Sequence, residues 1–262
     1  IFGGEDQDPP QYGKVFISLK PTDASYLTSL TKSQIIADLK KYVVASVEPR
    51  IVDPSILFVE LSSKIYYNSG VTDQTAAQIR DKVISTVQSY LDTSDTEKFN
   101  GKFRYSKAVG VIDDADVSIN SNLTSVTMRK DFYPQLNSTF YYEVCFQNAF
   151  DEDCDDPVLS STGFRVTEYP NFDVYVEDRN KKIVLYRLDT VTGEKVVLDN
   201  DIGDIDYIKG ELKMYALTII QGSFFDNRIS LRVKPLSNDI KAIREVYLDV
   251  DVANSSFTAY KE

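Results

Sequence analysis

The segment LFVELSSKIYY (residues 57–67), followed by AAQIRDKVISTVQSYL (residues 76–91), changes from a two-residue to a helical hydrophobic period. In the first segment apolar residues alternate with Glu60, Ser62 and Lys64, which indicates a strand with one wet face. In the second segment apolar residues recur every three or four positions and form one continuous helical face. A strand followed by an amphipathic helix predicts a sheet that is covered by helices on one side.

The sequence before this segment follows the same pattern of strand and helix. Residues 3–13 form an acidic connector marked by Gly and Pro, and residues 15–19 then alternate as a strand does. A first helix is predicted to open at Thr31, because Gln34 stands three residues later in the spacing of a capping box. Pro49 is expected to mark the end of this helix.

The sequence after residue 67 completes the first region. The second helix is predicted to begin near residues 72–73, and a short third helix covers residues 104–109. Two strands are expected at residues 116–119 and 123–129, joined by a turn at residues 120–122. The order of elements predicts an α+β fold, in which two main helices lie on one face of a small, mostly antiparallel sheet.

From about Tyr133 onward the helical period is lost, except for a weak candidate at residues 238–244. Short alternating segments with turn residues between them predict an antiparallel all-β domain, either a sandwich or a barrel. The segments are residues 140–146, 172–177, 183–188, 211–217, 228–233 and 246–252.

These patterns divide the chain into a linker at residues 1–13, an α+β domain at residues 14–133 and a β-rich domain at residues 134–262. The sequence opens without an initiating Met and without a charged leader that precedes an apolar core. We therefore expect a segment of a larger protein rather than a secreted precursor.

The composition excludes several functional classes. Apolar residues make up 42% of the 262 residues, enough for a large core, and the net charge of −11 disfavours binding to phosphate backbones or anionic lipid. The longest strongly apolar run, residues 215–220, is too short to span a membrane. Because the chain has no histidine, it cannot use Ser-His or Cys-His nucleophiles or imidazole zinc ligands. No phosphate-binding glycine loop is present, so neither a cofactor nor a small-molecule substrate is predicted.

The chain has two cysteines, Cys145 and Cys154. Two are too few for a disulfide framework, and a chain of this length does not need one. Free thiols in a reducing cytoplasm are the favoured interpretation, and a local bridge between the two remains the alternative.

An acidic loop repeats the first half of a calcium-binding loop at Asp151, Asp153 and Asp155. The pattern then fails, because the sixth position is Asp156 rather than Gly and the twelfth is Thr162 rather than Glu. A solvated acidic loop is the favoured interpretation, and a calcium-dependent binding module is the alternative.

A second acidic cluster surrounds Gly203 with Asp199, Asp201, Asp204 and Asp206. Such carboxylates can bind a hard cation or serve as an acid/base pair, which makes a carboxylate-dependent hydrolase of cell-wall glycans an alternative function. Apolar residues interleave with them, however, and this alternation favours a turn that leads into a hairpin.

Tyrosine is frequent in the predicted strands. Cross-strand packing and contact with a partner protein explain this enrichment equally well. The tyrosines are Tyr66, Tyr67, Tyr141, Tyr142, Tyr169, Tyr175, Tyr186 and Tyr215.

On another predicted strand, residues 246–252, Asp249 and Asp251 are expected to form the solvent-exposed face.

Several motifs resemble a known family. The run GGEDQDPPQYG (residues 3–13) into KVFI (residues 14–17) resembles the joint in baseplate wedge proteins of contractile-tailed phages. RYS, GVID and DV within residues 104–117 are similar to the motif that closes the C-terminal domain of baseplate J-like proteins. Over residues 3–129 the chain resembles the C-terminal part of the inner-ring wedge subunits of T-even-type phages. GDIDY and GEL within residues 203–212 resemble a hairpin of phage structural proteins.

The resemblance implies a structural role without catalytic, metal or cofactor-binding residues. Such subunits form homodimers that join into a ring around the tail hub, bind other wedge proteins and help transmit the rearrangement that triggers sheath contraction. We therefore expect a non-enzymatic protein of the virion tail baseplate, assembled in the host cytoplasm. Nucleic acid, membrane and small-molecule substrates are not expected as partners.

Overall fold

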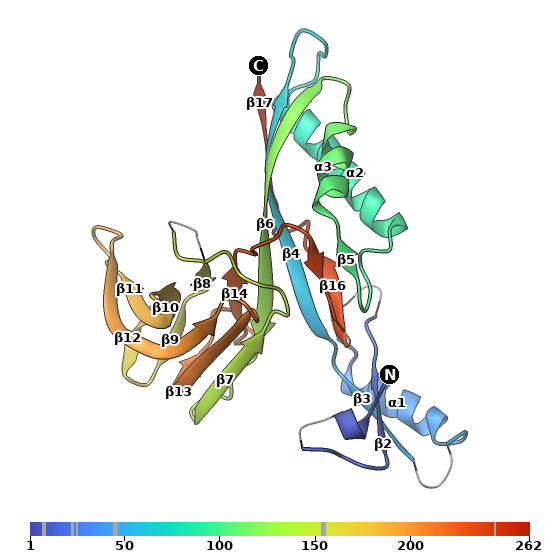
Figure 1. The fold of residues 1–262 in the computed structure, drawn as a ribbon, viewed down its shortest axis with the longest axis vertical. Coiled ribbons are helices and arrows are strands. Elements are labelled where there is room, and N and C mark those ends of the chain that lie inside the picture. The colour runs from blue at the N-terminus through green and yellow to red at the C-terminus, as the bar shows by residue number, and fades with distance from the viewer. Residues whose placement is uncertain (7–8, 22–23, 25, 44–46, 153–155, 244) are drawn as a thin grey trace.

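A computed structural model of the chain describes residues 1–6, 9–21, 24, 26–43, 47–152, 156–243 and 245–262. The fold is α+β, as the sequence predicts, with helices gathered in the first half and strands throughout (Figure 1). The helices are α1 (Ser29–Leu39), α2 (Ala76–Thr93) and α3 (Tyr105–Asp113), preceded by a 3-10 turn, η1 (Gly4–Asp6). The strands are β1 (Phe2–Gly3), β2 (Lys14–Ser18), β3 (Glu48–Val52), β4 (Ser55–Tyr67), β5 (Lys102–Phe103), β6 (Ile119–Phe132), β7 (Thr139–Cys145), β8 (Leu159–Ser161), β9 (Phe164–Val166), β10 (Tyr169–Arg179), β11 (Lys182–Leu188), β12 (Lys195–Asp206), β13 (Glu211–Gln221), β14 (Ile229–Val233), β15 (Ile240–Lys241), β16 (Val246–Val250) and β17 (Ser256–Lys261).

Two long antiparallel strands, β4 and β6, form the spine of the molecule (Figure 1). β14 continues the sheet beside the final residues of β6, and β8 joins β14 to the rest of the β-rich region. On the other side of the spine, β16 and β17 pair with β4 one after the other, both in parallel. The last strands of the chain therefore complete the sheet that β4 begins.

Five strands close a ring of hydrogen bonds beside the spine. β10 pairs with β11, β11 with β12, β12 with β13, β13 with β9, and β9 with β10. This closed barrel, with β7 attached to β13, agrees with the predicted antiparallel β architecture. Its interior is filled by fully buried side chains such as Val174, Ile183 and Ile219.

Helices α2 and α3 cover one face of the spine (Figure 1). α2 begins after Thr75, whose side chain accepts from the backbone N–H of Gln78 while the Gln78 side chain accepts from the N–H of Thr75. This capping box satisfies two donors that the first helical turn leaves unpaired. The predicted apolar stripe is confirmed, and its four innermost residues are buried against the sheet: Ile79, Val83, Val87 and Leu91.

The first 52 residues form a small unit of their own, in which α1 lies on the three-stranded sheet β1-β2-β3. β1 and β2 are antiparallel, and β2 and β3 are parallel. Among the described residues of this unit, the buried apolar side chains are those of Phe16 and Pro49, and the Phe16 ring stacks on Phe2. We call residues 1–52 the N-terminal unit.

Several predicted helix boundaries are wrong. α1 begins after Thr28, which accepts from the N–H of Thr31, so the cap lies one turn before the predicted box. α1 ends at Leu39, and Pro49 lies in β3 instead of closing the helix. α2 begins three residues later than residues 72–73, because Thr75 has a partner at the capping-box spacing. α3 extends to Asp113, four residues beyond its predicted end.

Some strand predictions are also wrong. Residues 119–132 form one strand, β6, and the predicted turn at residues 120–122 lies inside it. The region around Gly203 is a continuous strand, β12, rather than a turn. Glycine is needed at this position because a Cβ atom would lie 2.3 Å from the Lys213 carbonyl oxygen of the neighbouring strand. The weak helix candidate at residues 238–244 contains β15 and no helix among its described residues.

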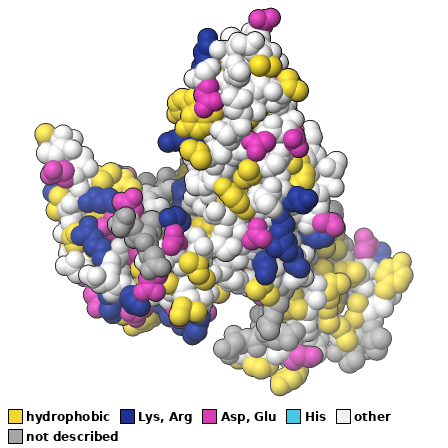
Figure 2. Space-filling model, turned by 45° about the horizontal axis from the view of Figure 1, so that its top comes forward, with side chains coloured by type: hydrophobic (Ala, Val, Ile, Leu, Met, Phe, Trp, Pro, Cys, Tyr) yellow, Lys and Arg dark blue, Asp and Glu magenta, His cyan; other side chains and the backbone are white. Residues whose placement is uncertain are grey.

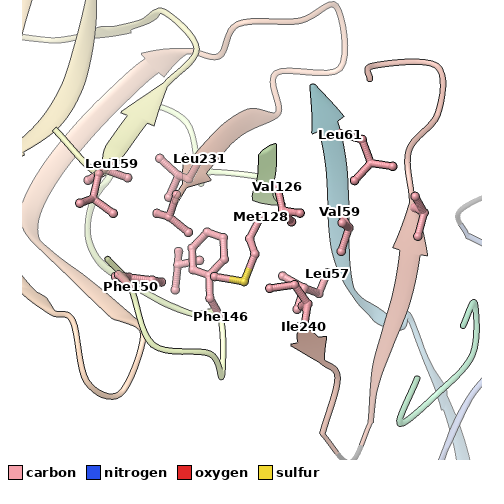
Figure 3. Packing of buried hydrophobic residues seen from close by; sticks show 14 of the residues in the cluster. Leu57, Val59, Leu61, Val126, Met128, Phe146, Phe150, Leu159, Leu231 and Ile240 are labelled. Atoms are coloured by element: carbon pink, nitrogen blue, oxygen red, sulfur yellow. The ribbon is translucent and has the colours of Figure 1, made fainter. Parts of the chain in front are cut away.

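The buried side chains form one continuous core across both halves of the chain. Figure 3 shows the point of contact, where Leu57 and Val59 of β4 and Met128 of β6 face Phe146 and Phe150 of the β-rich half. All five side chains are at most 1% exposed. The spine and the β-rich half therefore share their core.

The division at residues 133/134 stays a prediction, and the hydrogen bonding crosses it. β16 and β17, at residues 246–261, belong to the same sheet as β4. Residues 1–13, predicted as a linker, contain β1 and η1, and β1 pairs with β2.

Candidate functional site

A cluster of ion pairs lies between β4, β6, β14 and the turn that follows β16. The Arg129 guanidinium donates from Nη1 to Glu60 and, at 2.8 Å, to Asp251, and from Nε to Asp131 at 3.1 Å. Arg232 donates from Nε to Glu60 at 2.7 Å. Glu60 and Arg129 are 8% and 5% exposed. We call these five residues the ionic joint.

Further contacts complete the ionic joint. Ser230 donates from Oγ to Asp131 at 2.6 Å, and Arg228 Nη1 lies 3.7 Å from the same carboxylate. The Arg129 guanidinium also lies over the Phe58 ring, 4.2 Å from its centroid. Three carboxylates thus face three guanidinium groups, and the charges of the cluster balance. A cluster in which opposite charges are balanced and paired is the form in which buried charges are tolerated.

The electrostatics follow from this geometry. Burial opposes the charge of Arg129, but Asp131 and Glu60 outweigh it and raise its pKa above the usual value. Burial likewise opposes the charge of Asp251, but hydrogen bonds from Asn254 and Arg129 outweigh it and lower its pKa. Because each of these carboxylates already accepts from a cation, the cluster fixes four segments in one arrangement and offers no free acid or base for catalysis.

The sequence does not reveal the ionic joint. Glu60 was predicted to lie on the wet face of its strand, and this is wrong, because Arg232 of β14 covers it. Ser62 and Lys64 are exposed as predicted, since β14 does not reach that half of β4. Asp249 and Asp251 do not form a wet face either: they pair with Lys20 and Arg129. The feature of the sequence that could have revealed the ionic joint was the presence of charged residues inside otherwise apolar strands.

The predicted acidic cluster at residues 199–206 lies on β12 and remains exposed. Lys182 of the neighbouring strand pairs with Asp201 at 3.1 Å and with Asp204 at 2.9 Å. Asp204 also accepts from the Tyr215 hydroxyl at 2.6 Å, and these two hydrogen bonds lower its pKa. Asp206 accepts from the backbone N–H groups of the turn that follows β12. The cluster therefore consists of separate surface contacts.

The predicted calcium loop is described only in part, because Asp153 and Asp155 lie outside the described residues. Asp151 pairs with Lys234 at 2.7 Å, and Glu152 pairs with Lys181 at 2.7 Å. Within the part of the chain that the structure describes, no three acidic or cysteine side chains come together as a metal site would require.

Other predicted features have simpler outcomes. Cys145 is a free, half-exposed thiol, and its proposed partner Cys154 lies outside the described residues. Cross-strand packing accounts for several tyrosines, since Tyr175 stacks on Tyr186 and Tyr66 on Tyr260. None of the helices in the described ranges combines the length and hydrophobicity that a membrane span requires.

The N-terminal unit carries several exposed apolar side chains. α1 has no buried residue, and Leu30 and Tyr42 are 70% and 87% exposed. Tyr12 is 80% exposed on the same unit. Hydrophobic side chains are correspondingly visible on this unit, at the lower right of Figure 2.

Lys20 and Tyr26, among the described residues after β2, contact the rest of the molecule. Lys20 Nζ lies 3.8 Å from Asp249 of β16 and 5.2 Å from the centre of the Tyr247 ring. The Tyr26 ring meets the edge of Tyr133, and burial, with the nearby Tyr133 and Asp131, raises the pKa of Tyr26 to about 12. Within the described residues, these contacts and the ion pair of Lys32 with Asp53 at 2.7 Å hold the N-terminal unit at its border.

Comparison with known proteins assigns both parts of the first half. The family model of baseplate structural protein gp6, C-terminal domain I, matches residues 1–52, and that of its C-terminal domain III matches residues 55–131. These two segments are therefore similar to C-terminal domains of baseplate structural protein gp6. The first match coincides with the N-terminal unit, and the second runs from the start of β4 almost to the end of β6.

A curated relative agrees with these matches. The baseplate wedge protein gp6 of Enterobacteria phage T4 is 30% identical over 124 residues. This alignment covers 47% of the present chain and 19% of the relative's length. The predicted resemblance to the C-terminal part of a baseplate wedge protein is confirmed, because both matched models describe C-terminal domains.

Proposed function

We propose that this chain is a structural subunit of a phage tail baseplate wedge and has no catalytic activity. The observation that carries the proposal is the match of residues 1–52 and 55–131 to two C-terminal domains of gp6. The protein would be part of the virion tail baseplate, assembled in the host cytoplasm. Its partners would be other copies of the chain and other wedge proteins, rather than nucleic acid, membrane or a small molecule.

Self-association and binding to wedge proteins are supported by the N-terminal unit. Folded domains usually bury an apolar helix face, but α1 buries none of its residues. Exposed apolar groups of this kind are typical of protein–protein contact sites. We infer that another baseplate subunit covers α1, and that homodimers of this kind join into a ring around the tail hub.

Transmission of movement is supported by the spine. β4 and β6 are 13 and 14 residues long, and the ionic joint ties them to β14 and to the C-terminal turn. The joint makes the spine and the β-rich half one stiff body, whereas the N-terminal unit is attached by few contacts. We infer that the N-terminal unit moves relative to this body during the change that triggers sheath contraction.

The alternative functions have no comparable support. A glycan hydrolase needs one carboxyl group poised as an acid and another as a base or nucleophile, but Asp201 and Asp204 are exposed and paired with Lys182. In the predicted calcium loop, the described acidic residues Asp151 and Glu152 each pair with a lysine.

Pull-down of the purified wedge proteins of the same phage with this chain tests the proposal. We expect at least one wedge protein to be retained, and Leu30→Asp together with Tyr42→Asp to abolish the retention. Val191→Asp together with Ile208→Asp, at positions of the β-rich half that are 91% and 84% exposed, is the matched control. Absence of any retained wedge protein, combined with measurable turnover of peptidoglycan, would refute it.

A further inference from the structure

β17 is an edge strand of the spine sheet (Figure 1), and we call its unpaired side the border. Among the described strands only β4 pairs with it. The N–H of Glu262 donates to the Tyr67 carbonyl at 2.9 Å, as the next step of the parallel ladder. Since every second residue of a parallel strand directs its N–H and C=O toward the same neighbour, residues 256, 258 and 260 bond to β4. The N–H and C=O groups of residues 257, 259 and 261 therefore point outward, away from the sheet.

The opposite border of this sheet is protected, which makes β17 unusual. Beside β6, the Tyr105 hydroxyl donates to the Thr124 carbonyl at 2.8 Å, and the Asn122 side chain donates to Val109 and Asp113 of α3. Natural proteins normally protect a border strand with a covering helix, a proline or charged side chains. β17 has neither a proline nor a charge before its last residue, Lys261.

The exposed face beside this border has few acidic side chains: Glu262, which follows β17, accepts from the Asn120 side chain at 2.8 Å at one end of it. Nine residues point to the side of β17, β4 and β6 that the helices leave open, and the strand registers arrange them in three rows. The rows are Ser256-Ser62-Ser125, Thr258-Lys64-Leu123 and Tyr260-Tyr66-Ser121. The only charged residue among them is Lys64, on a chain whose net charge is −11. Two copies can approach each other here without the repulsion that opposes contact elsewhere.

We propose that β17 pairs in antiparallel fashion with β17 of a second copy of this chain, so that two spine sheets join into one. The pairing is self-complementary: a two-fold axis beside residue 258 or 259 sets each outward N–H against an outward C=O. This inference rests on the proposed self-association and assigns the surface that carries it.

The size of the contact predicts a weak dimer. Six residues of border strand and a few neighbouring side chains bury less than the roughly 1,200 Å² of a stable interface. We therefore expect dissociation in the micromolar range or above for the isolated chain, with further contacts stabilising the pair in an assembly.

Sedimentation velocity of the full chain, from low to high micromolar concentration, tests the proposal. Ala259→Pro removes an outward N–H without removing a bond to β4, and we expect it to raise the dimer dissociation constant at least tenfold. Ala259→Ser retains the N–H and should leave the constant within twofold of wild type. The thermal midpoint of each variant shows that the fold is retained.

Thr258→Lys gives a second readout that does not depend on proline. Position 258 is exposed, and in the pair its side chain lies next to the same region of the other copy, so like charges meet. We expect a weaker dimer at low salt and partial recovery at 0.5 M salt, about where screening becomes strong. A dimer unaffected by both variants would overturn the assigned surface but leave the proposed self-association intact. A chain that stays monomeric throughout would overturn both.

Discussion

Helices α1 and α2 lie on sheets of the same chain but are packed in different ways. α2 buries four apolar side chains against the spine, and its first turn is closed by a complete capping box. α1 has a single cap contact from Thr28 and no buried residue. The body from β4 onward therefore stabilises itself, whereas the N-terminal unit has too few buried side chains to do so.

The difference shows where the chain depends on other proteins. Burial of apolar area is the main source of folding free energy, so a unit in which few apolar residues are buried contributes little to stability. The exposed apolar residues of α1 become useful only when another surface covers them. The contrast predicts that changes in the body reduce stability strongly and that equivalent changes in the N-terminal unit affect association instead.

The largest expected effect is in the ionic joint. Arg129→Met leaves the buried Glu60, Asp131 and Asp251 without their shared cation, and we expect the free energy of unfolding to fall by about 3–5 kcal/mol. Urea denaturation monitored by circular dichroism measures this change. Arg165→Met breaks an exposed pair and is the control, with a change of at most about 1 kcal/mol. Equal effects of the two substitutions would contradict a stabilising role for the joint.

The second prediction compares the helices directly. Ile79→Ala, at a position of α2 that is 0% exposed, should lower the free energy of unfolding by about 2–4 kcal/mol. Ile36→Ala, on the half-exposed face of α1, should lower it by less than about 1 kcal/mol. Urea denaturation again gives both values. If the two losses are alike, α1 is packed as firmly as α2 and the contrast does not hold.

The third prediction concerns pH and the attachment of α2. Asp116 is 6% exposed, and hydrogen bonds from Lys82 at 2.6 Å and from Ser118 hold its pKa well below the usual range. A lowered pKa stabilises the folded state above the unfolded-state value near pH 4, and this contribution is lost as the pH falls further. Asp116→Asn should cost about 1–3 kcal/mol at pH 7, and the difference from wild type should shrink below pH 4.

Denaturation at pH 7, 5 and 3 measures this dependence. Asp95→Asn, at a side chain that is 95% exposed, is the control and should change stability by less than about 0.5 kcal/mol. A difference between Asp116→Asn and wild type that stays constant with pH would contradict the assigned role of the carboxylate.

The smallest effect is expected in the exposed acidic cluster. Asp201→Asn breaks a pair with Lys182 in which both side chains are about half exposed, so the change should stay within about 0.5 kcal/mol. Its thermal midpoint should match that of wild type. A loss of several kcal/mol would mean that this cluster, like the ionic joint, holds the fold together.

Periodicity was sufficient to predict the elements that have one wet face. The stripe of α2 and most strands of the barrel follow from the spacing of apolar residues, because each of these elements buries one side. β12 was missed, because its aspartates were attributed to a turn that leads into a hairpin. In the structure Gly203 lies in a strand where another backbone approaches too closely for any side chain.

The ionic joint was beyond the reach of the sequence. Glu60, Arg129 and Asp251 are separated by 69 and 122 residues along the chain and meet only through the sheet. The parallel return of β16 and β17 to β4 is equally non-local. At residues 199–206 the favoured interpretation was a structural role, and in the structure Asp201 and Asp204 both pair with Lys182 on an exposed strand.

The central claim is that this chain acts through its surfaces, and light scattering coupled to size-exclusion chromatography tests it most directly. The molar mass should rise with concentration for the chain alone, and mixing with wedge proteins of the same phage should give a complex of defined mass. A constant monomer mass up to high micromolar concentration, without a complex in any mixture, would contradict the claim.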